Sequence, residues 1–561
     1  MSDASTLAGS LRTLAEFAEI RGAITESADL RHAARAIEAL GPAAAADLRA
    51  RARRDTLQDE PGIADALSPV IQALTVQGDI AVLQAAQASL PVLYTHLLTA
   101  AVIRPDEAAA LVTRCDVVTF ADLRAAVADQ RVNQLGEALS VRLERAARAL
   151  ESGGWFMPLG RARDVLEAFA ADIGAAHVPV DLVAVAGDVR RFEALVETLA
   201  IVVRASDPAT AVDAICGLPA VEGVPYRSAR RAVVAVRQGE IDIRVASPDQ
   251  YGAALFEATG SPSHVAAIRR RGESLSPASN EDELYSAVGL PFVVPELRQN
   301  TGEIEAAASG RLPSLLTRQH VRGDLHMHTT YSDGGDTLQT MVAACCRLGY
   351  EYIAITDHSQ RAAASRTLSR RDLSRQRDEI ASLRLRYPDI AILHGVEVDI
   401  MPDGSLDFSD RILESLDIVL ASLHDPAHHD GARLTRRCIQ AIRHPLVTIV
   451  THPANRLVGR RDGYPLDFEA VYAAAAEAGT ALEVDGAPSH LDLDGAHARA
   501  AIAAGVTLSV DSDCHRARLL ARQMELGIGT ARRGWVEPRH VLNTRPLEEV
   551  RAFIAAKRSR R

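Results

Sequence analysis

The segment GDLHMHTTYSDGG, residues 323–335, places several groups that can bind a metal ion close together in the chain. His326 and His328 are two residues apart, so in an extended strand their side chains point to the same face. Asp333 follows five residues after His328. A single histidine here would be read as an ordinary core or surface residue. Two on one face, with a carboxylate just beyond, indicate a metal site.

Length and composition limit the class of protein. The 561 residues predict roughly two to four domains, and 47% hydrophobic residues supply several cores. We find no apolar run long enough to span a membrane and no secretory signal in MSDASTLAGS. Six cysteines without a CxxC pair are typical of reduced thiols, so a cytoplasmic protein is expected. The net charge of −11 argues against a protein that coats nucleic acid, but it does not exclude a local basic groove.

The periodicity of apolar residues divides the chain into three predicted regions. Residues 1–150 read as helical, because apolar residues recur every three or four positions, as in LRTLAEFAEI. Residues 151–318 mix helical patterns with the strand-like runs VDLVAVAGD, LAIVVRA, RAVVAV and EIDIRVA, which predicts an α+β domain. Residues 319–561 alternate short apolar runs with helical patterns. The prediction is therefore a multidomain protein.

Seven apolar runs in the third region predict a parallel sheet. They are GDLHMH, YIAITDH, AILHGVEVD, DIVLASLH, VTIVTHP, TALEVDG and VTLSVDSDCH. Successive β–α units form parallel sheets, and closure into an α/β barrel is the natural inference. The polar residues fall late in each run or just after it, and such strand ends gather at one mouth of a barrel.

The strand ends supply more metal-binding groups than one ion requires. Thirteen of the 18 histidines lie between His320 and His515. The nine candidate ligands are His326, His328, Asp333, His358, Glu397, His424, His452, Asp513 and His515. Zinc usually takes four ligands, so nine indicate two or three divalent ions, and imidazole with carboxylate suits zinc, manganese or iron. We interpret six other histidines of this region as core or surface residues: His394, His428, His429, His444, His490 and His497.

Neighbouring metal ions and arginines together suggest phosphate chemistry. Ions about 3.5–4 Å apart activate water and stabilise the entering and leaving oxygens of a phosphate ester. Arg456, Arg460 and Arg461 in NRLVGRRDGY are candidate phosphate-binding residues, since guanidinium groups bind phosphate well. A solvated basic surface is an equally weighted interpretation of these arginines.

The motifs GDLHMHTTYSDG, ITDHS, GVEVDI, SLH, THP and SDCH strongly resemble the PHP (polymerase and histidinol phosphatase) domain. Their order also resembles the C-terminal domain of bacterial family X DNA polymerases. The resemblance implies a distorted (β/α)7 barrel and a trinuclear site whose nine ligands map onto the nine residues above. It also implies a metal-dependent phosphoesterase, often a 3′–5′ exonuclease on DNA. One departure is EVDGAPSHLDL, where the family usually has Asn-Ala-Asn; we expect Asp485 and Gly486 to alter substrate contacts.

The middle region resembles the polymerase part of the same family, a nucleotidyltransferase-like fold. In VAGDVRRFEALVETLAIVV, Gly187 and Arg191 match the family's Gly-Ser-x-Arg-Arg motif. The positions of the triphosphate-binding serine and of two magnesium-binding aspartates hold Asp188, Thr198 and Ala200, and the third aspartate position keeps Asp242. Nucleotidyl transfer needs carboxylates that hold Mg²⁺. We therefore predict this fold without polymerase activity.

The helical region resembles helix-hairpin-helix DNA-binding modules in degenerate form. EPGIADAL keeps Pro61, Gly62 and Ile63 but has Ala64 where a second glycine is usual, and LPVLYTHLL has no hairpin glycine. Glycine allows the close backbone approach to phosphate, so weak DNA binding is expected. The only lysine is Lys557, which excludes a lysine-dependent Schiff-base lyase in this region.

The leading hypothesis is a DNA-repair 3′–5′ exonuclease on a polymerase-like scaffold. DNA is the expected partner, no membrane association is expected, and no catalytic residue is assigned beyond the metal ligands. Three alternatives are an active gap-filling polymerase with a PHP nuclease, a small-molecule phosphatase of the histidinol phosphatase type, and a non-enzymatic binding protein. Thr198 and Ala200 argue against the first, and the nine-ligand set argues against the last.

Overall fold

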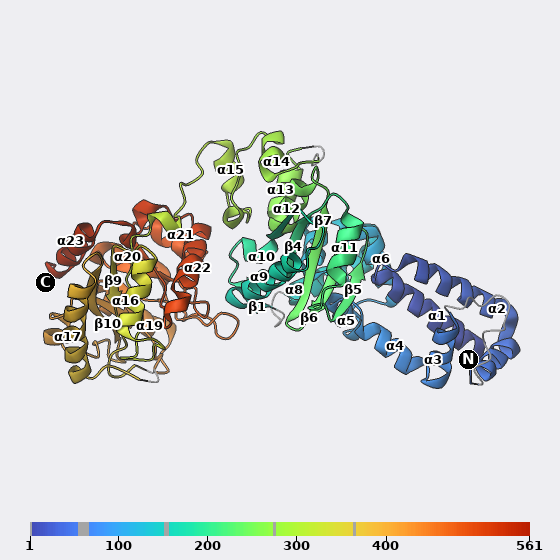
Figure 1. Cartoon of the computed structure of the whole chain (residues 1–561), viewed down its shortest axis with the longest axis horizontal. Helices are drawn as coiled ribbons and strands as arrows, with labels where there is room; N and C mark the ends of the chain where they lie inside the picture. Colours follow the sequence, from blue (N-terminus) through green and yellow to red (C-terminus); the bar gives the residue numbers. More distant parts are fainter. Residues whose placement is uncertain (1–2, 54–66, 151–155, 273–276, 363–365, 561) are drawn as a thin grey trace. The chain divides into compact units, whose positions relative to one another are not determined.

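The computed structural model describes residues 3–53, 67–150, 156–272, 277–362 and 366–560. The chain forms two compact units (Figure 1). Unit 1 comprises Met1–Phe156, Arg161–Arg190 and Val196–Ala308, and unit 2 comprises Met157–Gly160, Arg191–Leu195 and Ser309–Arg561. The predicted boundary near residue 150 lies within unit 1 and stays a prediction. The start of unit 2 at Ser309 lies near the predicted boundary at residue 319.

The first part of unit 1 is helical, which confirms the prediction from periodicity (Figure 1). Its described elements are α1 (Asp3–Ile20), α2 (Ile24–Arg53), α3 (Ser68–Val76), α4 (Asp79–Ala88), α5 (Val92–Thr99), α6 (Pro105–Cys115), α7 (Phe120–Ala128), the 3-10 helix η3 (Arg131–Leu135) and α8 (Glu137–Leu150). Their apolar faces form one core, which Tyr226 and Val233 of the following part join. Pro61, Gly62, Ile63 and Ala64 lie outside the described residues.

The second part of unit 1 contains a five-stranded sheet with the order β2-β4-β7-β6-β5. The strands are β2 (Leu182–Val185), β4 (Leu199–Arg204), β5 (Gly223–Arg227), β6 (Arg231–Val236) and β7 (Gly239–Ala246). Strands β4 and β7 pair in parallel, with Ala200 opposite Asp242, and the other pairs are antiparallel. The four strand-like runs in the sequence became strands. Strand β5 was missed because the glycine and proline of GVPYR interrupt its pattern.

Helices cover this sheet. A short two-stranded sheet pairs β1 (Met157–Pro158) with β3 (Leu195–Val196), and all of it except Val196 belongs to unit 2. The helical elements are α9 (Leu159–Ala175), α10 (Gly187–Arg190), α11 (Pro208–Cys216), α12 (Tyr251–Thr259), α13 (Pro262–Arg269), α14 (Glu281–Ala287), η4 (Pro295–Leu297) and α15 (Glu303–Ala308). Ala200 and Val202 of β4 pack against Tyr251 and Leu255 of α12. This packing places the sheet position of Ala200 in an apolar environment.

A buried ion network ties the helical part of unit 1 to its sheet. Arg231 Nε lies 2.8 Å from Asp242 Oδ1, and Arg231 also pairs with Asp122 in the first turn of α7. Arg244 contacts the same two carboxylates, at 2.8 Å from Asp122 and 3.2 Å from Asp242. Burial opposes ionisation of Asp122, but the two arginines hold its pKa well below the ordinary value. All four charges are therefore matched inside the protein.

Unit 2 is built on a seven-stranded parallel sheet with the order β14-β13-β12-β11-β10-β9-β8, as predicted. The strands are β8 (Gly323–Asp324), β9 (Tyr352–Ile355), β10 (Ala391–Asp399), β11 (Ile418–Ser422), β12 (Ile449–Val450), β13 (Ala481–Asp485) and β14 (Leu508–Asp511). The two edge strands approach each other, since Met327 and Cys514 form a parallel bridge and His328 N donates to Cys514 O at 3.0 Å. The sheet is thus a nearly closed barrel.

Helices surround the barrel. They are α16 (Leu338–Arg347), α17 (Arg370–Arg386), α18 (Asp410–Leu413), α19 (Gly431–Arg443), α20 (Phe468–Ala478), α21 (Gly495–Ala503), α22 (Leu520–Arg533) and α23 (Leu547–Arg558), with the 3-10 turns η5 (Arg318–His320), η6 (Ala517–Leu519), η7 (Pro538–His540) and η8 (Leu542–Thr544). Leu482 and Val484 of β13 pack into the large core that these helices cover. Ala481 belongs instead to the inner cluster with Val550 and Ile554 of α23.

Successive residues of each barrel strand point alternately inward and outward, so each strand has an inner and an outer face. Glu483 and Asp485 share the parity of the inward residue Ala481. In the same way, Glu397 follows the inward Leu393 of β10, and His424 follows the inward Leu420 of β11 after even steps. The polar residues at the strand ends are therefore aimed at the barrel mouth.

Two buried carboxylates join the edge strands of the barrel. Asp511 Oδ1 accepts a hydrogen bond from Leu325 N at 2.7 Å, and Asp324 Oδ1 accepts one from Ser512 N at 3.1 Å. Burial and the nearby Asp511 raise the pKa of Asp324 to about 7. These reciprocal bonds link the ends of the two edge strands, next to the bridge between Met327 and Cys514.

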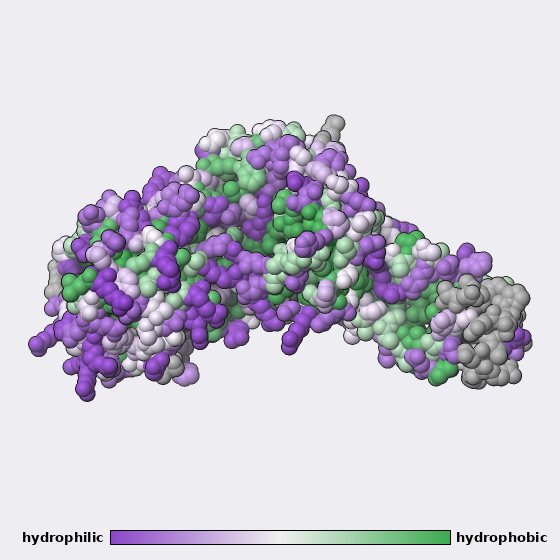
Figure 2. All heavy atoms as spheres, in the orientation of Figure 1, coloured by the Kyte–Doolittle hydropathy of each residue, from purple (hydrophilic) through white to green (hydrophobic). Residues whose placement is uncertain are grey.

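None of the described helices is both long and apolar enough to cross a bilayer. Figure 2 shows hydrophilic side chains spread over the visible face, with apolar patches between them. The exposed large apolar residues belong to separate elements, such as Ile80 of α4, Leu182 of β2 and Leu385 of α17.

The ion network predicts that Arg231→Ala will strongly destabilise unit 1. The substitution leaves Asp122 and Asp242 buried with only Arg244 to neutralise them, which typically costs about 3–5 kcal/mol. Hydrogen exchange should show a matching loss of protection in α7 and β7.

Arg269→Ala is the matched control, because Arg269 pairs with Glu257 and Asp129 at the surface and is 40% exposed. It should cost no more than about 1 kcal/mol. Equal effects of the two substitutions would contradict the assigned role of the network.

Candidate active site

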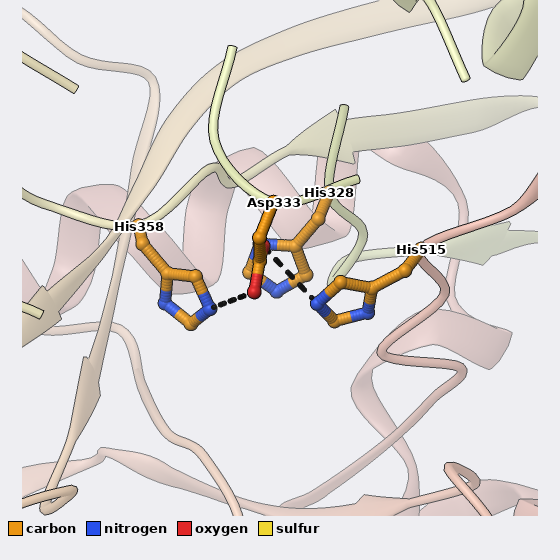
Figure 3. Close-up of side chains that lie close together, drawn as sticks. All are labelled: His328, Asp333, His358 and His515. Carbon is orange, nitrogen blue, oxygen red and sulfur yellow. Dashed lines mark ion pairs between the residues drawn. The ribbon is translucent and has the colours of Figure 1, made fainter. Parts of the chain in front are cut away.

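The nine sequence-predicted ligands converge at the carboxyl ends of the barrel strands. The first group centres on Asp333, in the loop after β8 (Figure 3). Its carboxylate lies 3.6 Å from His358 Nε2 and 3.3 Å from His515 Nε2. His328 Nδ1 lies 3.9 Å from the same carboxylate, and its ring stacks on His515. Figure 3 shows that the three imidazoles surround the carboxylate.

A second group forms on the other side of His328. Asp513 Oδ1 lies 3.0 Å from His328 Nε2 and 3.5 Å from His326 Nε2. The two Nε2 atoms are 3.1 Å apart, and both rings are fully buried. His328 therefore lies between the Asp333 group and the Asp513 group, with one ring nitrogen toward each.

A third group centres on Glu397, which is 1% exposed. Its Oε2 lies 2.6 Å from His358 Nδ1, and its Oε1 lies 3.3 Å from His424 Nε2 and 3.1 Å from His452 Nε2. His358 thus joins the Glu397 group to the Asp333 group in the way that His328 joins the other two.

The donor set fits divalent metal ions. In each of the three groups, candidate ligand atoms lie within 4.8 Å of one another: His328, Asp333, His358 and His515; His326, His328 and Asp513; and His358, Glu397 and His424. Imidazole nitrogens with carboxylate oxygens, and no thiolate, are typical of zinc, manganese and iron sites. The lone pairs of neutral imidazoles packed this closely have few hydrogen-bond donors of the protein beside them, and bound cations would interact with these lone pairs instead.

Two carboxylates outside the predicted set orient the ligands. Glu483 Oε1 lies 2.7 Å from His326 Nδ1, and Asp399 Oδ1 lies 2.8 Å from His424 Nδ1. Such contacts fix the tautomer that leaves Nε2 free to bind a metal. Sequence reasoning missed both residues. The sequence could have indicated both, because they are acidic residues at the strand ends in GVEVDI and ALEVDG. Each lies an even number of residues from an inward-facing position of its strand, as the ligands do.

The carboxylates also set the protonation of the histidines in the metal-free protein. Burial lowers the pKa of His424, but Glu397 and Asp399 outweigh it and raise the pKa to about 9. His515 is likewise raised to a pKa of about 9 against its burial, mainly by Asp333 and Asp513. A metal ion must displace these protons, so metal affinity should fall as the pH falls.

Comparisons with known proteins identify the family. Residues 324–457 match the PHP domain. The DNA polymerase/3′-5′ exonuclease PolX of Bacillus subtilis is 30% identical over 568 aligned residues, which cover 97% of this chain and 98% of that protein. The chain belongs to the PolX family. With its PHP domain it is a metal-dependent phosphoesterase.

Relatives of the PHP part alone are also found. A probable phosphatase of Shewanella oneidensis is 34% identical over 206 residues, which cover 34% of this chain and 75% of that protein. The crystal structure of histidinol phosphate phosphatase from Lactococcus lactis, complexed with zinc, L-histidinol and phosphate, has 18% identity and a TM-score of 0.31. The matched region covers 38% of this chain and 93% of the Lactococcus lactis protein.

The residues at the predicted polymerase positions lie on neighbouring strands of this PolX family member. Ala200 lies opposite Asp242 in the parallel register of β4 and β7. Asp242 is 3% exposed and bound by Arg231 and Arg244, and a degenerate polymerase site here stays a prediction. Asp188 Oδ2 accepts a hydrogen bond from Glu197 N at 2.9 Å, beside Thr198.

In the second segment that resembles a hairpin motif, a carboxylate of the protein itself accepts a hydrogen bond from a backbone N–H. LPVLYTHLL spans the N-cap Pro91 and nearly all of α5, and Val92 N at the start of this helix donates to both carboxylate oxygens of Glu240 at 3.1 Å. A DNA phosphate would use such a helix-start N–H. Burial raises the pKa of Glu240 to about 7. Glu240 therefore already binds the backbone N–H of Val92 that this segment would offer to a DNA phosphate.

The three candidate phosphate-binding arginines lie in the loop after β12. Arg456 donates from Nε to His490 O at 2.8 Å and pairs with Asp494 at 3.3 Å. Arg461 donates to Asn455 O at 2.7 Å, and Arg460 is exposed. Arg456 and Arg461 therefore brace loops, and a phosphate-binding role for the three arginines stays a prediction.

The departure EVDGAPSHLDL contains one residue that packing requires. A side chain at Gly486 would come within 2.0 Å of Gln523 O in α22, so only glycine fits there. Asp485 and His490 lie beside Asp513 at the metal centre. His490 had been interpreted as a core or surface residue. The sequence signal that could have found it was its position five residues after an inward strand-end acid.

The other non-ligand histidines occupy varied surroundings. His394 is buried and lies 3.2 Å from Gln376 Oε1, and His497 lies 2.7 Å from the Tyr472 hydroxyl. His444 pairs with Asp410 at 3.4 Å. His428 and His429 lie in the loop after β11. None of these five belongs to a group of metal-binding atoms among the described residues.

The Glu483–His326 contact predicts that Glu483→Gln will weaken metal binding. The amide removes the negative charge that orients His326 and makes it more basic, and such losses typically cost 10–100-fold in metal affinity. Competition between the protein and a chromophoric chelator for Zn²⁺ measures the change. Glu351→Gln is the control, because Glu351 pairs with Arg322 at the exposed surface and should leave affinity unchanged. Equal affinities for E483Q and the parent protein would refute the role of Glu483.

The Glu240 contact predicts a pH-dependent stability difference. The folded-state pKa of about 7 lies above the ordinary 4.5, so the folded chain binds more protons between these values and its stability falls as the pH rises through them. Glu240→Gln keeps an acceptor for Val92 N but cannot ionise. The variant should therefore gain on the order of 3 kcal/mol over the parent at high pH.

Urea denaturation of both proteins from about pH 5 to pH 8 measures this difference. Glu137→Gln in the first turn of α8 is the control for loss of an exposed carboxylate. Parallel stability curves for the parent and E240Q would contradict burial of an ionisable Glu240.

Proposed function

We propose that this protein shortens DNA from the 3′ end at the mouth of its PHP barrel and does not transfer nucleotides. The observation that carries the proposal is the convergence of all nine candidate ligands into three linked groups. The nine residues would hold two or three Mn²⁺, Zn²⁺ or Fe ions. The relative from Bacillus subtilis, which spans nearly the whole chain, is named as a 3′-5′ exonuclease, and this supports DNA as the substrate.

Bound ions at such a centre supply a nucleophilic water at neutral pH and neutralise charge on the phosphate. The residues of this chain hold and orient those ions. Asp333, Glu397 and Asp513 each face two or more imidazoles and supply negative charge. Glu483 and Asp399 fix the tautomers of their histidine partners. No general acid outside the metal ligands is needed for this assignment.

Loss of nucleotidyl transfer is supported by residue chemistry at the polymerase positions. Thr198 and Ala200 supply no carboxylate, and Asp242 is already neutralised by Arg231 and Arg244. Asp188 would repel the triphosphate. With no pair of free carboxylates, magnesium has no bridging site against a nucleotide.

The remainder of unit 1 would position DNA at most weakly. Glu240 takes the α5 backbone donor that a phosphate would use, and this fits the degenerate hairpin sequences. A DNA substrate accords with the expected cytoplasmic location. Binding to DNA would then be governed mainly by the PHP unit and its loops.

A second candidate is hydrolysis of a small phosphomonoester. It is favoured by the relative from Shewanella oneidensis, a probable phosphatase that aligns with the PHP part alone. In that case unit 1 would serve regulation or assembly, and the metal centre would act by the same chemistry.

A gapped duplex labelled at the 5′ end tests the proposal. With Mn²⁺, the protein should shorten the labelled strand from its 3′ end, and added deoxynucleotides should produce no extension. His326→Ala/His328→Ala removes two candidate ligands, of which His328 belongs to two of the metal groups, and should abolish shortening. Chelation of the metal should have the same effect on the parent protein.

Two results would overturn parts of this proposal. Extension of the strand would refute the assignment of an inactive polymerase site. Absence of shortening, together with metal-dependent turnover of a small phosphomonoester, would favour the second candidate.

A further inference from the structure

A fourth group of metal-binding atoms adjoins the nine-ligand set. Candidate ligand atoms of Asp485, His490 and Asp513 lie within 4.8 Å of one another. Asp513 belongs to the nine, whereas Asp485 and His490 do not. Asp485 ends β13, and His490 lies in the loop that follows it.

Asp485 is a buried carboxylate with an unused oxygen. The residue is 0% exposed, and its place in β13 aims it inward with Ala481 and Glu483. Oδ1 accepts a hydrogen bond from Ala487 N at 2.6 Å. In the described part of the chain, Oδ2 has no hydrogen-bond partner. A buried carboxylate in this position needs a neutralising partner, because desolvation of an unpaired charge is costly.

The surrounding residues do not supply that partner. Of the charged groups around Asp485, Asp513 and Glu483 add negative charge, and His326 opposes them without a hydrogen bond to Oδ2. Glu483 is itself engaged on both oxygens, by His326 Nδ1 at 2.7 Å and His452 N at 2.8 Å. The inner face of β13 therefore adds negative charge next to Asp513, and a cation would balance it.

His490 is held in the tautomer of a metal ligand. Its Nδ1 lies 2.9 Å from Arg456 O, a carbonyl that can only accept, so Nδ1 carries the proton. Nε2 then keeps its lone pair. Ligand histidines are commonly fixed by such a backbone bond. The ring stacks on His452 of the predicted set, with centroids 5.1 Å apart.

The loop that carries His490 is braced in place. Arg456 Nε donates to His490 O at 2.8 Å, and Val458 N donates to Ser489 O at 2.8 Å. His490 N donates to Ala487 O at 2.9 Å. The histidine is therefore positioned by the fold and not by chance exposure at a loop tip.

We propose that Asp485, His490 and Asp513 bind an additional divalent cation beside the centre formed by the nine ligands. Two carboxylates and one imidazole suit Zn²⁺ or Mn²⁺, and three protein ligands leave an open position for water or a phosphate oxygen. Asp513 would be shared between this ion and the His326–His328 group. The inference rests on the proposed function only through the presence of metal at Asp513.

Metal stoichiometry of the full chain tests the inference. The protein is stripped of metal, reloaded with Zn²⁺ and freed of excess, and zinc per chain is measured by mass spectrometry. Asp485→Asn, which keeps the side-chain shape, should bind one zinc ion fewer than the parent. His490→Gln should lose the same single ion, and the double variant should lose no more than either one.

His444→Gln is the matched control, since it removes a histidine of the same unit that belongs to no metal group among the described residues. It should keep the zinc content of the parent. Anomalous diffraction from zinc-loaded crystals of the parent should show a peak in contact with Asp485 and His490, a readout that does not depend on folding of a variant.

Unchanged zinc content in D485N and H490Q, or no anomalous peak at these residues, would overturn the inference. The DNA assay separates this failure from failure of the proposed function. A parent that shortens DNA but shows no zinc at Asp485 refutes only the additional ion. A parent with that zinc but no action on DNA refutes only the proposed substrate.

Discussion

Compensation of buried negative charge is the constraint on which the barrel mouth depends. Asp333, Glu397 and Asp513 lie among imidazoles that can be either neutral ligands or cations. In the metal-free protein the carboxylates are balanced by protons on histidine, and His424 and His515 have pKa values raised to about 9. Metal ions and protons therefore compete for the same charge balance. Folding, metal uptake and chemistry in this unit are consequently linked to pH through one set of residues.

Much of the barrel could be predicted because its signal is local. Each strand is a short apolar run. Because side chains alternate between the two faces of a strand, the inward direction of a residue such as Leu420 predicts that of a polar residue an even number of positions later, such as His424. The supporting contacts could not be predicted in this way. Glu483 reaches His326 across 157 positions of sequence, and only the closed sheet brings them together. The surroundings of His490 could not be predicted for the same reason, since its tautomer depends on the Arg456 carbonyl of another loop.

Unit 1 uses two of its acidic residues for internal contacts. Asp242 of β7 pairs with arginines, and Glu240 of the same strand accepts a hydrogen bond from the start of α5. The sequence indicates that Thr198 and Ala200 supply no carboxylate. It could not show that Asp242 is neutralised, because Arg231 is joined to Asp122 over 109 positions of sequence. Both contacts arise only when the fold brings distant residues together.

The ion network also limits the routes by which this chain could change. A carboxylate introduced at Ala200 would lie opposite Asp242, whose charge Arg231 and Arg244 already match. Removing either arginine to free Asp242 would strand Asp122 in the interface between helices and sheet. A change at any one of these four charges therefore leaves a buried charge without its partner, which is costly. The network thus fixes Asp242 as an internal structural residue of unit 1.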